Sequence, residues 1–242
     1  MKKLTSVFTA ILLLVLMLTS CNTKSPTKSE SDTVTDVDGN VYQTVVIGNQ
    51  RWMAEDLKVT HYSDGSSIAK ITSNTAWQNL TSGAYCAHEN DENNVATFGY
   101  LYNWFAVNDN HNIAPQGWRV PTDADWKELE MYLGMSQEEA DKVDYRGTDE
   151  GGKLKEAGTS LWSNPNIGAT NESGFTGRPG SYRYEDGNFH PMSPLGFALY
   201  WTSTETGATN AWDRLLSSDE AKVYRHNRNK ACGMAVRLVK DN

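Results

Sequence analysis

The segment with the most recognisable chemistry is GTDEGGKL, residues 147–154, which nearly spells a phosphate-binding loop. In that motif a serine or threonine follows the lysine, and its hydroxyl group holds magnesium. Leu154 stands at that place here, and the pattern before Gly147 does not predict a buried parallel strand. The segment therefore argues against nucleotide binding.

Acidic residues close to a glycine make DVDGN, residues 36–40, similar to a calcium loop. An EF-hand has glycine at the sixth position of its loop and glutamate at the twelfth. Here the glycine is fourth and Ile47 is twelfth, so we predict a plain turn. A second polar segment, ENDENN at residues 89–94, favours an exposed loop tip over a cation cage. Calcium binding thus has no supporting motif, and we predict no metal and no cofactor.

Residues for acid–base or nucleophilic catalysis are scattered along the chain. The five histidines show no pair at helical or zinc-ligand spacing: His61, His88, His111, His190 and His226. No GxSxG motif occurs. The adjacent carboxylates at 138–139 and 149–150 lie on segments that read as exposed, where burial would not tune their pKa values. We therefore predict no catalytic residue and a protein that is not an enzyme.

The residues best suited to bind a ligand lie in a long coil. Residues 147–196 contain ten glycines, and so long a coil in a compact domain is usually functional or disordered. Its aromatic residues favour order. Five side chains are of types that hydrogen-bond sugar hydroxyls or stack on rings: Asn164, Asn166, Asn171, Glu172 and Tyr182. The same residues could instead brace the backbone of the coil, and the sequence leaves both readings open.

The frame that must hold these loops is clearest in GWRVPTDADWKELEMYLG, residues 117–134. Residues 118–120 predict a short strand, and Thr122 with Asp125 forms the capping box that opens a helix. Gly134 ends that helix. Three apolar residues at helical spacing are expected to face a core, and three charged residues to face water: Trp126, Leu129 and Leu133, and Lys127, Glu128 and Glu130.

The rest of the chain predicts short strands joined by turns. A two-residue Gly48–Asn49 turn is expected between strands 41–47 and 50–53. Helical segments are expected at 52–57, 136–143 and 153–157, and further strands at 59–62, 84–88, 97–107, 197–203, 211–216, 222–225 and 234–239. This pattern predicts an α+β fold with an antiparallel sheet, one main helix and long loops.

The first residues predict export and lipid attachment. Lys2 and Lys3 precede an apolar run at 7–18, which is shorter than the roughly 20 residues that span a membrane. The following LTSC resembles the lipobox of bacterial lipoproteins, with Cys21 lipidated at the mature N-terminus. We therefore predict a signal peptide at 1–20, a flexible tether at 21–33 and one domain at 34–242. The expected location is the bacterial cell envelope, at the outer membrane, with the face left open.

Charge and cysteine content limit the partners. Without Lys2 and Lys3, the mature chain has 20 basic and 30 acidic residues, a net charge of −10. Such a chain repels nucleic acid and anionic bilayers, so its membrane attachment is expected to rest on the lipid of Cys21. Cys86 and Cys232 could form a disulfide in an oxidising envelope, but the sequence gives no distance between them.

Six motifs in order resemble the Fibrobacter succinogenes major paralogous domain, a family of secreted and lipid-anchored bacterial proteins. They are DVDGNVYQTVVIGNQRWMAEDL, FGYLYNWFAV, GWRVPTDADW, GGKLKEAGTSLW, NPNIGATNESGF and YWTSTE. The resemblance implies a C-type lectin-like fold, also found in sulfatase-modifying enzymes. Family members often carry two cysteines at the places of Ala114 and Leu238, as if one disulfide had been lost here.

The resemblance also shapes the expected function. The lectin triplets that hold calcium are missing, since Trp212–Asp213 is followed by Arg214. The paired cysteines of formylglycine-generating enzymes are missing as well, because Cys232 is alone near the C-terminus. We expect a lipid-anchored, non-catalytic binding or adhesion module for polysaccharide or a surface protein. The alternatives are a structural envelope protein without a specific ligand and, third, a lectin-fold enzyme.

Overall fold

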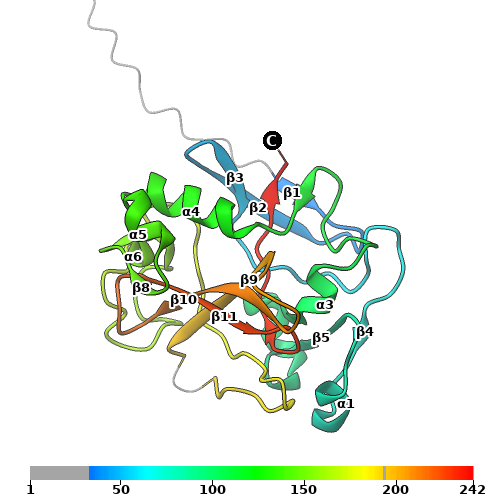
Figure 1. The fold of residues 1–242 in the computed structure, drawn as a ribbon. Coiled ribbons are helices and arrows are strands. Elements are labelled where there is room, and N and C mark those ends of the chain that lie inside the picture. Colours follow the sequence, from blue (N-terminus) through cyan, green and yellow to red (C-terminus); the bar gives the residue numbers. More distant parts are fainter. Residues whose placement is uncertain (1–32, 193–194, 242) are drawn as a thin grey trace, which may run out of the picture.

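The computed structural model describes residues 33–192 and 195–241 of the chain. The predicted signal peptide, Cys21 and all of the predicted tether except Thr33 lie outside these residues. Within them, small β-sheets and short helices pack around large apolar clusters, which is an α+β arrangement (Figure 1). None of the helices in these two ranges has the length and hydrophobicity of a membrane span.

The first sheet joins the two ends of the described chain. Its spatial order is β1 (Thr33–Thr35), β2 (Val41–Ile47), β3 (Gln50–Met53), β13 (Val239–Lys240) and β7 (Trp118–Arg119). The predicted hairpin is confirmed, because Ile47 pairs with Gln50 across a two-residue turn. The predicted turn at 36–40 is confirmed too: the Asp36 carboxylate accepts hydrogen bonds from the backbone N–H groups of Asp38 and Asn40.

The second sheet separates two apolar clusters. Its order is β8 (Asp144–Arg146), β11 (Val223–Asn229), β10 (Asn210–Ser217) and β9 (Phe197–Glu205), and all neighbours are antiparallel. Successive side chains of a strand point to opposite faces of its sheet. Accordingly, Ala198 and Tyr200 of β9 belong to one cluster, whereas Leu199 and Trp201 belong to the other.

The third sheet has the order β12 (Gly233–Met234), β6 (Tyr100–Asn103), β5 (Ala84–Ala87) and β4 (Ala69–Lys70). Strands β4 and β5 run parallel and depart from the predicted antiparallel pairing, which the other pairs of named strands follow in the described residues. The predicted strand at 97–107 is interrupted by α2 (Val95–Phe98) and α3 (Trp104–Val107). Asn103 starts α3, since its side chain accepts a hydrogen bond from the Ala106 N–H group.

Helix α4 (Asp123–Tyr132) lies over β9 and β10 (Figure 1) and has the predicted capping box. Thr122 Oγ1 accepts from the Asp125 N–H group at 3.2 Å, and Asp125 accepts from the Thr122 N–H group at 2.6 Å. Trp126 is fully buried, as its spacing predicts. Its ring lies 5.1 Å from Trp52 and 5.5 Å from Phe175 between centroids. The helix therefore packs the core through one aromatic cluster.

Glu130 of this helix was expected to face water, and this prediction was wrong. Its side chain is fully buried and pairs with Arg146 at 2.5 Å and with Arg214 at 2.7 Å. The position follows from helical geometry, because Glu130 lies four residues after the buried Trp126 and therefore on the same face. Burial is tolerated because two guanidinium groups neutralise the carboxylate.

Other predicted elements also differ. Residues 52–57 do not form a helical turn; Met53 and Leu57 instead donate to the carbonyl groups of Leu238 and Val236. Residues 59–62 contain only an isolated bridge at His61 rather than a strand. Helix α5 (Gln137–Asp141) begins at the predicted Ser136 cap and ends two residues before its predicted end, whereas α6 (Glu150–Leu154) begins three residues before its predicted start. Segment 66–83, which carried no prediction, holds β4 and α1 (Asn74–Gln78). The short η1 (His88–Asn90) and η2 (Glu92–Asn94) occupy the predicted loop tip.

Candidate functional site

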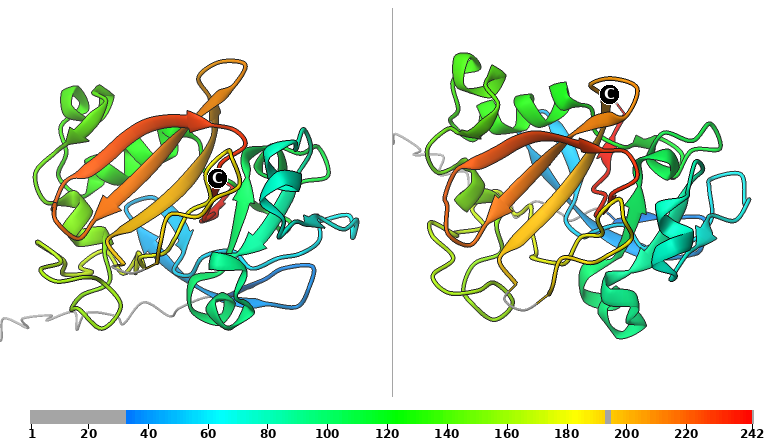
Figure 2. Two further views of the ribbon diagram at one scale, coloured as in Figure 1. Left: turned by 90° about the horizontal axis from the view of Figure 1, so that it is seen from below. Right: turned by 60° about the horizontal axis from the view of Figure 1, so that its bottom comes forward.

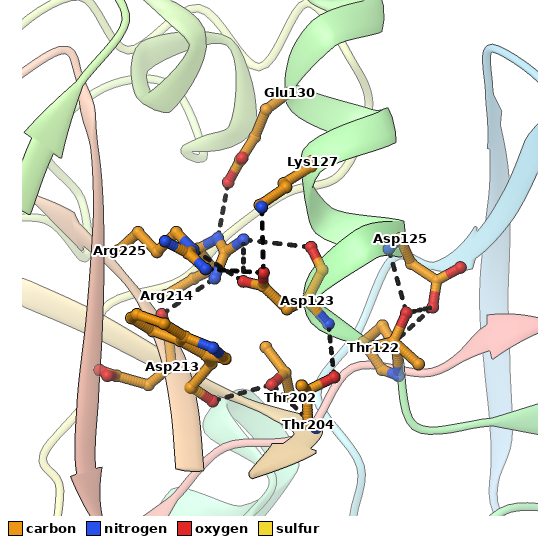
Figure 3. A network of polar contacts seen from close by, with 12 residues as sticks. Thr122, Asp123, Asp125, Lys127, Glu130, Thr202, Thr204, Asp213, Arg214 and Arg225 are labelled. Atoms are coloured by element: carbon orange, nitrogen blue, oxygen red, sulfur yellow. Dashed lines mark hydrogen bonds and ion pairs between the residues drawn. The ribbon is translucent and has the colours of Figure 1, made fainter. Parts of the chain in front are cut away.

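The densest cluster of charges lies between α4 and the second sheet (Figure 3). Asp123 pairs with Arg214 and Arg225, both at 2.8 Å, and Lys127 is 3.5 Å from the same carboxylate. Burial raises the pKa of Asp123, but the two guanidinium groups outweigh this effect and lower it. Because each charge in this network has a partner inside the fold, the network holds the helix on the sheet and leaves little for a ligand to bind.

The opposite face of the same sheet carries a different set of side chains. On β11, Tyr224, His226 and Arg228 alternate with Arg225 and therefore point away from α4. Each of the three is only partly buried. Figure 2 shows the yellow segment around residue 185 beside β9, so that the loop covers this face at the β9 end. On the part of the face formed by β11 and β8, Tyr224 is partly buried and Tyr145 is exposed.

Aromatic side chains continue across this face, and we call them the aromatic strip: Tyr145, Tyr182, Tyr184, His190, Phe197, Tyr224 and His226. His190 stacks on Tyr182 with ring centroids 4.9 Å apart, and Phe197 is 5.5 Å from His190. At the other end, His226 stacks on Tyr224 at 5.6 Å, and Tyr145 is 4.7 Å from Tyr224. Rings of this kind present an apolar face together with a polar edge, as binding surfaces often do.

Asp213 and Arg228 join the two halves of the strip. The Asp213 side chain is fully buried on β10, and its Oδ2 accepts from Arg228 Nε at 3.2 Å. The guanidinium group of Arg228 lies over the Tyr182 ring at 5.2 Å from the centroid. Asp213 is thus a positioning residue, since it fixes the arginine next to the rings. The other nitrogen atoms of Arg228 have no partner among the residues that the structure describes.

One oxygen of this buried carboxylate is not satisfied. In the described part of the chain, neither Asp213 Oδ1 nor His226 Nδ1 has a hydrogen-bond partner, although the two atoms are 3.8 Å apart. Burial raises the pKa of Asp213, and Arg228 opposes that rise. A buried acceptor without a partner is costly, by roughly 1–3 kcal/mol. Water or an ion can complete the hydrogen bonds of such a group.

A cavity of about 380 Å³ adjoins the strip. His190 and Phe197 form part of its wall, together with Asn164, Ser218 and Asp219. Its volume is within the range of small-ligand sites. The strip and the cavity together form a surface that can stack on apolar ring faces and donate or accept hydrogen bonds.

The structure brings together only some of the residues that the sequence proposed for ligand binding. Tyr182 belongs to the strip, and Asn164 lines the cavity. Asn166 is buried, and its side chain donates to the carbonyl groups of Glu156 and Gly158.

Asn171 and Glu172 lie elsewhere in the long coil. Asn171 accepts from the Thr176 N–H group at 2.8 Å and donates to the hydroxyl of the same residue. Glu172 is exposed and shares no cavity with the strip. Asn166 and Asn171 therefore brace the coil, the alternative that the sequence left open.

Sequence reasoning missed the charged and aromatic residues of β10 and β11. A signal for them was present: in VYRHNRN the residues Tyr224, His226 and Arg228 recur at every second position, which places them on one face of a strand. The pairing with Asp213 is not visible in the sequence, because it depends on the register between β10 and β11.

The other candidate groups that the sequence suggested are engaged in contacts within the fold or do not form the expected site. Lys153 donates to the Leu133 carbonyl and Gly152 packs against the Gly168 carbonyl, so the loop-like GTDEGGKL segment has no free phosphate cradle. Cys86 and Cys232 are both free and buried, without the disulfide that the sequence made possible. Among the described residues no group of three or more His, Cys, Asp or Glu side chains is placed to hold a metal ion.

Comparison with known protein families finds a match. The model of the Fibrobacter succinogenes major domain matches residues 45–240, which include most of the first sheet and all of the second and third. Neither a search of curated proteins nor a search of solved structures finds a significant match.

Proposed function

This chain belongs to the Fibrobacter succinogenes major domain family, and we propose that it is a non-catalytic binding module of the bacterial cell envelope. Its proposed ligand is a polysaccharide, bound across the aromatic strip and the adjoining cavity. The alternative function is that of a structural envelope protein without a specific ligand.

The observation that carries the proposal is the strip itself. A series of rings that are partly exposed, apart from the buried Tyr182, with a fixed arginine between them is an unusual feature for a surface without a partner, since tyrosine and arginine dominate binding energy at interfaces. Tyrosine contributes large contact area with little loss of side-chain entropy. Arg228 is held by Asp213 and can donate its remaining hydrogen bonds to ligand oxygen atoms.

The proposed attachment is a lipid on Cys21, with residues 21–33 as the tether. The lipobox-like LTSC supports this proposal, because it ends a short apolar run preceded by two lysines. Cys21→Ala is expected to move the protein from the membrane fraction into the soluble fraction. Sedimentation of this variant with membranes after a high-salt wash would contradict the proposal.

We also propose that the fold is C-type lectin-like. The support is the order of elements: the capped helix α4, the long coil at 147–196, then β9, β10 and β11 and a closing C-terminal segment. An experimental structure that aligns these elements with a C-type lectin domain would test it.

Binding is tested with the protein on a glycan array and on extracted envelope polysaccharide. The Tyr224→Ala/His226→Ala variant is expected to bind at least about tenfold more weakly, which corresponds to about 1.4 kcal/mol. Tyr132→Ala is the matched control, because Tyr132 is 65% exposed but lies on α4, away from the strip. Equal binding by all three proteins would remove the strip from the site. Capture of a protein with no glycan bound would reject a polysaccharide ligand.

A further inference from the structure

A second cavity lies apart from the aromatic strip, between the segment before β5 and the end of α3. Its volume is about 390 Å³, and it is lined by residues 81–83, 104–105 and 108–111. We propose that this cavity is a separate binding site for a neutral, hydroxyl-rich ligand, such as one pyranose residue of a glycan. The inference goes beyond the proposed function and does not depend on the strip.

Polar groups at the rim of this cavity are free to bind. In the part of the chain that the structure describes, the side chains of Asn108 and Asn110 have no hydrogen-bond partner and are exposed. The side-chain hydroxyl groups of Thr81 and Ser82 likewise have no partner among the described residues. Amides and hydroxyls both donate and accept hydrogen bonds. Sugar hydroxyls do the same, so the rim matches a neutral polyol better than an ion.

The aromatic part of the cavity gives such a ligand an apolar contact. Phe105 and Trp104 both line the cavity; Phe105 is partly exposed and Trp104 is buried. The indole N–H group of Trp104 donates to the Thr202 carbonyl at 2.9 Å, so this ring is fixed by the fold. A pyranose has one face of C–H groups that can lie on an aromatic ring, while its hydroxyls point sideways to the rim.

The two walls of the cavity are held together by one buried residue. Asn103 is fully buried; its side chain donates to the Ser82 carbonyl and accepts from the N–H groups of Ala84 and Ala106. Gly83 approaches α3 so closely that an added Cβ atom would lie 2.9 Å from Ala106 Cα. The walls are therefore set in place before any ligand binds, which reduces the entropic cost of binding.

The acidic residue of the cavity is used to shape the turn. Asp109 accepts hydrogen bonds from the backbone N–H group of His111 at 3.0 Å and from its ring Nδ1 at 2.6 Å. Tyr62 also bonds to this carboxylate. Asp109 is thus engaged inside the turn, whereas the neighbouring Asn108 and Asn110 are exposed.

A larger cavity, about 540 Å³ near Trp118, is a weaker candidate. Its principal acid, Asp36, already accepts from the Asn40 side chain and from the Tyr42 hydroxyl as well as from the backbone. Asn112, on the same wall, uses its side-chain oxygen to accept from the Ala114 N–H group.

The test is a nuclear magnetic resonance titration of the ¹⁵N-labelled domain with glucose, mannose, galactose and xylose and with their neutral hexasaccharides. The expected result is a saturable shift of the side-chain amide signals of Asn108 and Asn110 with at least one probe. In Asn108→Ala/Asn110→Ala the affinity for that probe is expected to fall at least tenfold. Asn49→Ala is the matched control, because Asn49 is an exposed residue of the β2–β3 turn.

Two outcomes would overturn the inference. The first is the absence of saturable shifts at these amides with every probe up to roughly 20 mM. The second is unchanged affinity in the double variant. The Tyr224→Ala/His226→Ala variant separates the two sites: if the strip alone binds sugar, this variant loses binding and the amide signals of Asn108 and Asn110 never shift.

Discussion

Glu130 on α4 and Arg214 on β10 are 84 residues apart in the sequence, and their side chains meet at 2.7 Å in the interior. Both are fully buried. This pair joins the main helix to the second sheet, whose other face carries the aromatic strip. The helix therefore supports the candidate site from behind without taking part in it.

Glu130→Ala is expected to lower the free energy of unfolding by roughly 3–5 kcal/mol, because it leaves the buried Arg146 without its carboxylate and removes one of the two carboxylates that pair with Arg214. Urea denaturation measures this change. Glu128→Ala is the control: it alters an exposed residue two positions earlier and should change stability by no more than about 0.5 kcal/mol. Similar losses in both variants would show that the buried pair does not stabilise the fold.

Trp126→Ala is expected to lower the free energy of unfolding by roughly 3–5 kcal/mol, since it removes the centre of the aromatic cluster. Thr122→Ala removes only the helix cap and should cost roughly 0.5–2 kcal/mol. Chemical denaturation of the two variants tests the order of these effects. A Thr122 variant as unstable as the Trp126 variant would mean that capping, rather than packing, holds α4.

Asp123 makes the fold sensitive to acid. Its pKa is lower in the folded chain than in the unfolded chain, so the folded state gains stability above a pH of about 4 and loses it as the pH falls further. Thermal unfolding between pH 2 and 7 should show a steeper decrease for the wild type than for Asp123→Asn, which has no such proton to bind. Parallel curves, with the variant less stable by the same amount at every pH, would contradict this origin of acid sensitivity.

The pKa of His88 should lie below the ordinary histidine value of about 6.5, and the pKa of His111 should lie above it. Burial lowers the pKa of His88 to about 4, whereas the hydrogen bond that the His111 ring donates to the Asp109 carboxylate raises the pKa of His111. Proton magnetic resonance of the imidazole rings measures both. In the unfolded chain His88 binds its proton at a higher pH than in the folded chain. Acidification from pH 6.5 to pH 4 should therefore lower the free energy of unfolding by about 3 kcal/mol through this residue. A His88 signal that titrates near 6.5 would contradict its burial.

Lys155 ties the long coil to the second sheet and should be sensitive to substitution. Its ammonium group donates to the carbonyls of Ile167, Ser217 and Glu220 at 2.8, 2.6 and 2.9 Å. Lys155→Met keeps the aliphatic stem but leaves these acceptors without a donor, so the free energy of unfolding should fall by at least about 2 kcal/mol. Lys142→Met, at an exposed residue, is the control in urea denaturation. A Lys155 variant as stable as this control would show that water replaces the ammonium group at no cost.

Local patterns in the sequence predicted the elements that depend on neighbouring residues. The capping box of Thr122 and Asp125, the Gly48–Asn49 turn and the strands β9 to β11 all follow from spacing within a few residues. Helical spacing also located Trp126 in the core. These features are local, because hydrogen bonds of caps and turns join residues two to four positions apart.

The tertiary structure alone decided which polar residues are buried and which residues form the candidate site. Glu130 has a charged side chain, and it can be buried because Arg146 and Arg214, on strands distant in the sequence, neutralise its carboxylate. Asp213 meets Arg228 through the register of two strands, and Tyr182 reaches them from a coil with no repeating pattern. Contacts between residues tens of positions apart depend on which distant segments pair and in which register. The periodicity of a single sequence does not indicate this pairing.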